Sequence, residues 1–82
     1  VEDENAVRAA VCTALRDAGF DVLECSGAPD AIGLVKRDAG KIACVVSDVV
    51  MPQINGLQLA AILRSIRPGL PVLLVSAYTE TR

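Results

Sequence analysis

The fold class follows chiefly from IACVVSDVVMPQINGL, residues 42–57. Its first five residues, 42–46, are all apolar, and a run of this length suits a strand better than a helix. The run does not alternate with polar residues, which predicts a strand covered on both faces, as in a parallel sheet between helices. Asp48 follows with only Ser47 between, and a turn-rich loop comes next, residues 51–54. The stretch therefore predicts a buried strand that delivers a carboxylate to the edge of a sheet.

One helix and one further strand are predicted downstream. Asn55 is a candidate N-cap for a helix whose apolar residues recur at helical spacing: these are Leu59, Ile62, Leu63 and Ile66. The breaker Pro-Gly-Leu-Pro at 68–71 ends that helix, and residues 72–75 form another unbroken apolar run.

The upstream half repeats the same alternation. Asn5 is a candidate N-cap for a first helix that ends near Gly19, and residues 20–25 are a short strand candidate. Pro29 suits the first turn of a second helix, which stops near Gly40. Strands that alternate with helices imply right-handed crossovers around a parallel sheet, so the predicted class is α/β.

Both ends of the sequence are abrupt for such a fold. Val1 is the one apolar residue ahead of the first helix, where a complete strand is expected, and only residues 76–82 follow the last strand. We therefore expect a segment of a longer domain that is unstable by itself. A cooperative thermal transition of the isolated segment well above room temperature would contradict this expectation.

Composition excludes several classes of function. The net charge is −2 and the basic residues are scattered, which argues against direct binding of nucleic acid. No stretch approaches the roughly 20 apolar residues of a membrane span. Cys12, Cys25 and Cys44 are widely spaced and the chain has no histidine, which excludes a Cys/His zinc site and argues against a disulfide framework. Small buried hydrophobes in a reducing cytoplasm are the expected role of the three cysteines.

Polar side chains follow three of the predicted strands. Glu2 and Asp3 follow Val1, Asp48 follows the run 42–46, and Ser76 follows the run 72–75. If these strands are neighbours, the side chains converge at one edge of the sheet. Clustered carboxylates repel one another, Mg²⁺ relieves that repulsion, and a carboxylate can act as nucleophile toward a phosphoryl group. Each residue also has a structural alternative, as a helix N-terminal acid, an ordinary loop aspartate or an N-cap.

Residues 47–57 resemble the phosphorylation loop of the receiver domains of two-component systems: an apolar strand, Asp, two residues, Met-Pro, and a short loop to Gly-Leu. VEDE at 1–4 is similar to the acidic pair that closes their first strand, and LLVSA at 73–77 to their fourth strand. The resemblance implies a flavodoxin-like, doubly wound parallel sheet, of order 2-1-3-4-5 in the complete domain. Residues 1–82 would then be a partial receiver domain that lacks most of strand 1 and everything after strand 4.

The same resemblance implies a magnesium site. Asp3 and Asp48 would bind Mg²⁺ directly, the backbone carbonyl of Val50 would be a third protein ligand, and Glu2 would act through a bound water.

The resemblance also implies how a phosphoryl group is held. Asp48 would be the phospho-acceptor, and Ser76 would contact the phosphoryl oxygen and shift inward on activation. Pro52 and Gly56 would shape the loop, and a residue without Cβ at position 56 lets the chain turn tightly into the third helix. The family's phosphate-contacting lysine ends a fifth strand. Lys41 does not match it, because Lys41 precedes the third strand.

The implied function is a non-enzymatic phosphoryl acceptor in a cytoplasmic phosphorelay. Its partner would be a sensor histidine kinase or a phosphotransfer protein, and a homodimer would form through the missing C-terminal face. The parent could be a hybrid histidine kinase, a DNA-binding regulator or a stand-alone receiver. One alternative is a pseudo-receiver that binds proteins without being phosphorylated. A phosphatase is disfavoured, because Val50 stands where such enzymes carry a second carboxylate.

Overall fold

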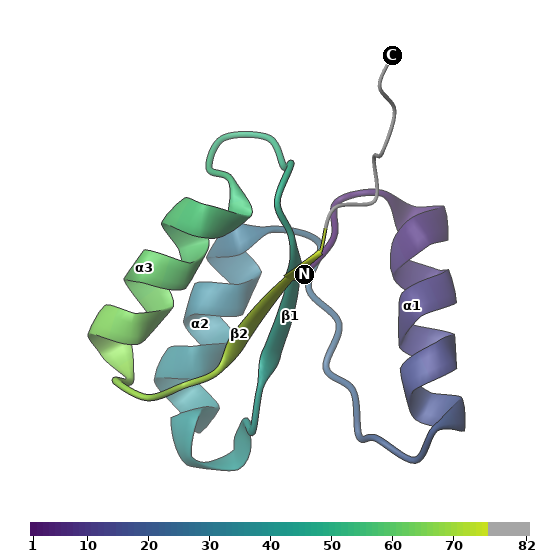
Figure 1. Ribbon diagram of the computed structural model, residues 1–82, viewed down its shortest axis with the longest axis horizontal. Helices are drawn as coiled ribbons and strands as arrows, with labels where there is room; N and C mark the ends of the chain where they lie inside the picture. Colours follow the sequence, from purple (N-terminus) through teal and green to yellow (C-terminus); the bar gives the residue numbers. More distant parts are fainter. Residues whose placement is uncertain (76–82) are drawn as a thin grey trace.

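The computed structural model describes residues 1–75, with the backbone alone described at Ala39. Two parallel strands pair in it, in a register that runs from Val45 opposite Val72 to Asp48 opposite Val75. Helices α2 and α3 lie on one side of these strands and α1 lies on the other (Figure 1). In chain order the elements are α1 (Asn5–Asp17), α2 (Ala28–Asp38), the 3-10 turn η1 (Ala39–Lys41), β1 (Val45–Asp48), α3 (Gly56–Ile66) and β2 (Val72–Val75).

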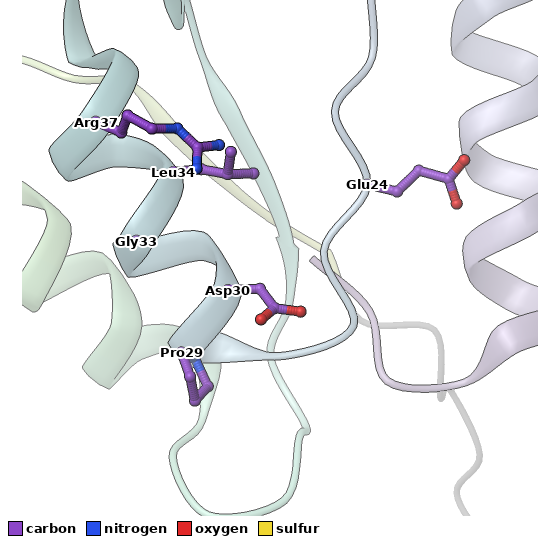
Figure 2. Close-up of a pocket in the computed structure, with 6 residues that line it drawn as sticks. All are labelled: Glu24, Pro29, Asp30, Gly33, Leu34 and Arg37. Atoms are coloured by element: carbon purple, nitrogen blue, oxygen red, sulfur yellow. The ribbon is translucent and has the colours of Figure 1, made fainter.

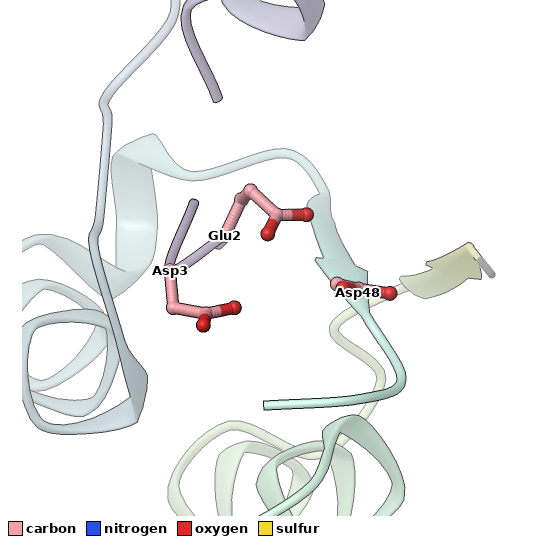
Figure 3. A group of neighbouring side chains, drawn as sticks. All are labelled: Glu2, Asp3 and Asp48. Atoms are coloured by element: carbon pink, nitrogen blue, oxygen red, sulfur yellow. The ribbon is translucent and has the colours of Figure 1, made fainter. Parts of the chain in front are cut away.

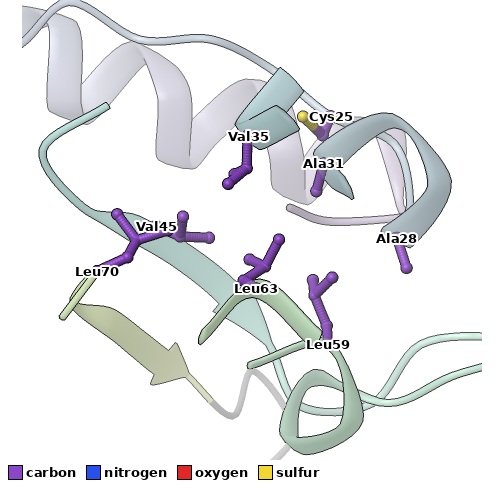
Figure 4. Packing of buried hydrophobic residues seen from close by; sticks show 8 residues of the cluster. All are labelled: Cys25, Ala28, Ala31, Val35, Val45, Leu59, Leu63 and Leu70. Atoms are coloured by element: carbon purple, nitrogen blue, oxygen red, sulfur yellow. The ribbon is translucent and has the colours of Figure 1, made fainter. Parts of the chain in front are cut away.

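The hydrophobic core lies between β1 and the pair α2 and α3 (Figure 4). Helical spacing turns the apolar residues of both helices toward the sheet, where Leu59 and Leu63 of α3 are fully buried. Leu70, in the loop between α3 and β2, is almost fully buried in the same core. The rest of the cluster consists of smaller side chains, which let the helices approach closely: Cys25, Ala28, Ala31, Val35 and Val45.

The start of α3 is confirmed and the start of α1 is not. Asn55 caps α3 through a capping box, in which its side chain accepts from the Gln58 N–H and the Gln58 side chain accepts from the Asn55 N–H. The N-cap of α1 is Glu4, so the prediction of Asn5 is wrong. The Asn5 side chain instead accepts a hydrogen bond from the Arg8 guanidinium.

The predicted ends of the helices agree with the structure. After α1, Gly19 takes a left-handed φ of 98°, and after α3, Gly69 takes a φ of 88°. Pro29 is the second residue of α2, where its missing N–H breaks no helical hydrogen bond.

Two predicted strands are corrected. Residues 20–25 form no strand, because their described backbone bonds form no ladder: the Phe20 N–H donates to the Leu15 carbonyl of α1 at 3.1 Å, and the Cys25 carbonyl accepts from the Glu2 N–H at 3.0 Å. The predicted strand 42–46 begins later, at Val45, and runs on to Asp48. Its start is set by the partner strand, since the Val45 N–H bonds the Pro71 carbonyl while the Ile42 carbonyl accepts from the Arg67 side chain instead.

The strand predicted to be covered on both faces, β1, is buried at Val45 and Ser47 and half-buried at Val46, whereas the neighbouring β2 is more open among the described residues. On the side of α1, Leu73 and Val75 are 59% and 45% exposed. They line an apolar hollow with Val46 and, from α1, Val7 and Val11. We call these five residues the open face. Among the described helices, none has the length and apolar character needed to cross a bilayer.

Candidate functional site

Asp48 is the last residue of β1 and is held there from both sides. Its N–H donates to the Val1 carbonyl at 3.0 Å, and the next N–H, of Val49, donates to the Val75 carbonyl at 3.0 Å. The backbone nitrogen of Val1 donates to the Val46 carbonyl at 2.6 Å. Val1, β1 and β2 are therefore neighbours, as the sequence predicted, and the carboxyl end of β1 opens between them.

The turn out of β1 requires Gly56. Its N–H donates to the Val49 carbonyl at 2.8 Å, which draws the first residue of α3 against the end of the strand. A Cβ built at this position would lie 2.4 Å from the Asp48 carbonyl oxygen and 3.0 Å from the Val49 Cα. Backbone atoms cannot yield at such distances, so only glycine fits. The predicted role of Gly56 is confirmed, and close packing against the Asp48 backbone is its cause.

Glu2, Asp3 and Asp48 form one acidic cluster (Figure 3). Each offers a carboxylate oxygen, and these oxygens all lie within 4.8 Å of one another. Glu2 is buried, Asp48 is half-buried and Asp3 is exposed, so the cluster opens to solvent on the Asp3 side. The sequence placed these carboxylates at one edge of the sheet, and the structure brings them together there.

The electrostatics of the cluster disfavour charge on Glu2. Burial raises the pKa of the Glu2 carboxyl above its ordinary 4.5, and the hydrogen bond from the Glu4 N–H opposes that rise. The nearby carboxyls of Asp48 and Asp3 raise the pKa further. The cluster is therefore an array of oxygens that a cation would stabilise.

The donor set fits Mg²⁺ in its chemistry. All three groups are carboxylates, the hard oxygen ligands that Mg²⁺ prefers, and the open Asp3 side leaves room for water or phosphate oxygens. Nitrogen or sulfur donors would instead have favoured a transition metal, and the cluster has none.

The other two residues of the predicted site are Val50 and Ser76. Val50 follows β1 in the loop, and its side chain is exposed. Ser76 lies outside the described residues, so its prediction rests on sequence. In the same loop, Gln53 takes a left-handed φ of 71°, directly after Pro52.

Two residues that contact this site received no role from the sequence. Ser47 is fully buried, and its hydroxyl donates to the Asp48 carbonyl at 3.0 Å. Arg8 counted only as one of the scattered basic residues, yet its guanidinium donates to the Glu2 carbonyl at 2.9 Å. The spacing of Arg8 three residues after Asn5 on a helix was the one available signal, since such residues lie side by side.

A second hollow, between α2 and residues 20–25, has no comparable chemistry (Figure 2). Of its two carboxylates, Asp30 accepts a hydrogen bond from the Ser26 hydroxyl. The other, Glu24, points toward α1 and pairs with arginines of that helix. Because both are engaged, the acidic cluster is the better candidate site.

Comparison with known proteins agrees with this arrangement. The family described as response regulator receiver domain matches residues 1–82. This chain belongs to that family. A receiver of two-component signalling is a signalling module and not an enzyme, and the α/β fold and parallel strands described above are its framework.

Several curated proteins resemble this receiver. It is 39% identical to the sensor kinase CckA of Brucella abortus, over 98% of this chain and 8% of that protein. It is 38% identical to the response regulator protein FleR of Pseudomonas aeruginosa, over 95% of this chain and 16% of that protein. The probable transcriptional regulatory protein TcrX of Mycobacterium tuberculosis is also 38% identical, over 94% of this chain and 32% of that protein. The receiver thus spans less than a third of the length of each of these relatives.

A solved structure shows the same fold. The crystal structure of the receiver domain from the hybrid histidine kinase CckA superposes with a TM-score of 0.82 at 30% identity, over 96% of this chain and 82% of that one.

Proposed function

We propose that this receiver accepts a phosphoryl group on Asp48 from a phosphohistidine of a sensor kinase or phosphotransfer protein, with Mg²⁺ bound at the acidic cluster. The observation that carries the proposal is the convergence of Glu2, Asp3 and Asp48 within 4.8 Å at the carboxyl end of a parallel strand. The segment 1–82 would act in the cytoplasm as part of a larger receiver sheet of order 2-1-3-4-5.

Asp48 suits the role of nucleophile because its backbone is fixed and its carboxylate is half-buried. The bonds of residues 48 and 49 to Val1 and Val75 hold the strand end, and Gly56 packs against the carbonyl. A fixed carboxylate loses little entropy when it attacks. One of its oxygens would form a bond to phosphorus while the phosphorus–nitrogen bond breaks. The electron pair leaves with the imidazole, which takes a proton from solvent, and water later hydrolyses the aspartyl phosphate.

Asp3 and Asp48 would hold the Mg²⁺ directly, with the Val50 carbonyl as a further ligand and Glu2 acting through a water. Bound there, Mg²⁺ would neutralise charge on the phosphoryl oxygens and offset the repulsion among the carboxylates. Glu2 suits the indirect role because it is buried, and its Oε2 already accepts from the Glu4 N–H at 3.0 Å.

Ser76 would complete the site as a hydrogen-bond partner of the phosphoryl group. It directly follows β2, whose last residue pairs with Asp48, so the sequence assigns it to the neighbouring strand end. A hydroxyl there would donate to a phosphoryl oxygen and favour the arrangement that the phosphorylated state prefers.

The test is incubation of the full natural protein with Mg²⁺ and acetyl phosphate, followed by measurement of intact mass. We expect one added phosphoryl group that is labile to base, requires Mg²⁺ and is absent in the Asp48→Asn variant. Asp21→Asn is the matched control, because Asp21 is exposed and lies outside the cluster. It should be phosphorylated as the unaltered protein is. No added mass in a folded protein, with its cognate kinase also tried, would favour a pseudo-receiver that only binds partners.

A further inference from the structure

The guanidinium of Arg8 joins three parts of the molecule. It donates to the Glu2 backbone carbonyl at 2.9 Å and to the Asn5 side-chain oxygen at 2.7 Å. Its Nε also lies 3.6 Å from a carboxylate oxygen of Glu24. The Arg8 side chain is only 19% exposed, so these contacts are partly shielded from water. Arg8 therefore links the first turn of α1 to the chain that carries the acidic cluster.

The contact with the Glu2 carbonyl bears directly on Asp3. A carbonyl and the next N–H belong to one rigid peptide plane, so fixing the carbonyl of residue 2 also fixes the N–H and Cα of residue 3. Glu2 is also held on its N-terminal side, where its own N–H donates to the Cys25 carbonyl. The orientation of the peptide between Glu2 and Asp3 thus depends on a side chain outside the cluster.

We propose that Arg8 is a positioning residue, which holds the peptide between Glu2 and Asp3 so that the carboxylates of the acidic cluster stay converged for Mg²⁺. The inference rests on the proposed function, because it takes the cluster as a metal site. Arg8 donates to the main chain and does not itself bind the ion. Without the guanidinium, the turn between residues 2 and 4 keeps the bond from the Glu4 N–H to Glu2 and the bond from the Arg8 N–H to the Glu4 carbonyl, but the Glu2 carbonyl loses its bond to the Arg8 side chain.

Arg16 provides a matched control on the same helix. It also pairs with Glu24, at 2.9 Å, and donates to the Val22 carbonyl at 3.2 Å. The Glu24 side chain points toward α1, where both arginines lie (Figure 2). The described bonds of Arg16 reach residues 22 and 24 and none reaches the acidic cluster, and its side chain is 47% exposed. A loss common to both arginines reports the docking of α1, whereas a loss specific to Arg8 reports the cluster.

The experiment measures Mg²⁺ affinity by titration calorimetry on the full natural protein and its variants, in buffer without phosphodonor. We expect Arg8→Ala to weaken Mg²⁺ binding about tenfold, as the loss of a group that orients metal ligands commonly does. Arg16→Ala should bind within about twofold of the unaltered protein. In the metal-free proteins, the backbone NMR signal of Asp3 should shift in Arg8→Ala and stay in place in Arg16→Ala.

Two further variants keep the test decisive if Arg8→Ala folds poorly. Arg8→Lys retains the charge but cannot donate to Glu2 and Asn5 together. Its Mg²⁺ affinity should therefore fall between those of Arg8→Ala and the unaltered protein. Glu24→Gln removes both ion pairs and leaves the Arg8–Glu2 bond, so its Mg²⁺ affinity should be unchanged. Equal losses of Mg²⁺ affinity in Arg8→Ala and Arg16→Ala would overturn the inference about Arg8 but leave the proposed metal site intact. Absence of Mg²⁺ binding by the unaltered protein would overturn the proposed metal site, and the inference with it.

Discussion

The two sides of the sheet are held together by different forces. On the side of α2 and α3 the contacts are apolar, and Leu59, Leu63 and Leu70 have almost no exposed surface. On the side of α1 the apolar residues of the open face are partly exposed, and the described links are polar: Arg8 to Glu2, and Arg8 and Arg16 to Glu24. Burial of apolar surface contributes more than partly exposed ion pairs do, so the α2 and α3 side carries most of the stability.

The N-terminus of the helix on the packed side is also the better stabilised of the two. The N-terminus of α3 is closed by a capping box, while no side-chain hydrogen bond caps α1. A capping side chain contributes about 1 kcal/mol, which adds to the advantage of the packed side. The acidic cluster lies where the two sides meet, with Asp48 on β1 and Glu2 and Asp3 at the entry to α1. The more weakly held side thus carries two of the three carboxylates.

The largest expected effect tests the packed side directly. Leu63→Ala should lower the free energy of unfolding of the full natural protein by about 2–5 kcal/mol, because it leaves a cavity in the core. Leu73→Ala, on the open face, should cost only about 0.5 kcal/mol. Urea denaturation measures both. An equal loss of unfolding free energy in Leu73→Ala would contradict the difference between the two sides, since it would mean that the open face is covered in the natural protein.

A smaller effect is expected at the junction of β1 and α3. Gly56→Ala should lower stability by about 1–3 kcal/mol, because the new Cβ overlaps the Asp48 carbonyl. Gly33→Ala is the control: Gly33 lies on α2, where a Cβ meets nothing within 4 Å, and alanine there should stabilise the helix by about 0.5–1 kcal/mol. Urea midpoints of the two variants should move in opposite directions. A neutral Gly56→Ala would contradict the close approach.

The smallest effect is a dependence of stability on pH in buffer without Mg²⁺. Because the pKa of Glu2 is raised in the folded state, this group stabilises the fold fully below about pH 4.5. That contribution is lost as the pH rises through the raised pKa. Glu2→Gln should remove the part of the slope that begins near pH 4.5 and ends once the pH has passed the raised pKa, measured by urea midpoints. Asp48→Asn should reduce it, since Asp48 is one cause of the rise. An unchanged slope in Glu2→Gln would contradict the assignment.

Sequence patterns predicted the helices and the convergence of the site well. Periodic apolar residues identify the inward side of α3. Asn55 begins α3 and Gly19 follows the end of α1, both where expected. Both kinds of signal are local, because they depend on residues within one or two turns. The acidic cluster was predictable because parallel strands end at a common edge, which turns order along the chain into proximity.

The strands were predicted less well, because a strand exists only where a partner is in register. Residues 20–25 have the composition of a strand, but one described backbone bond ties them to Glu2. The boundaries of β1 follow β2 and not its own apolar run. Likewise, an apolar run cannot show whether both of its faces are covered, since this depends on the position of α1.

The alternation of helices and strands, the family and the carboxylates at the strand ends all follow from the amino-acid sequence, because each depends on local spacing along the chain. Three features required the folded structure: Arg8 holds the Glu2 carbonyl, Gly56 packs against Asp48, and the α1 side stays open. These features join residues from separate elements, and no short-range pattern encodes such distances. Their physical cause is packing: when one element packs against another, the distance between them decides which side chains fit and which groups can form hydrogen bonds.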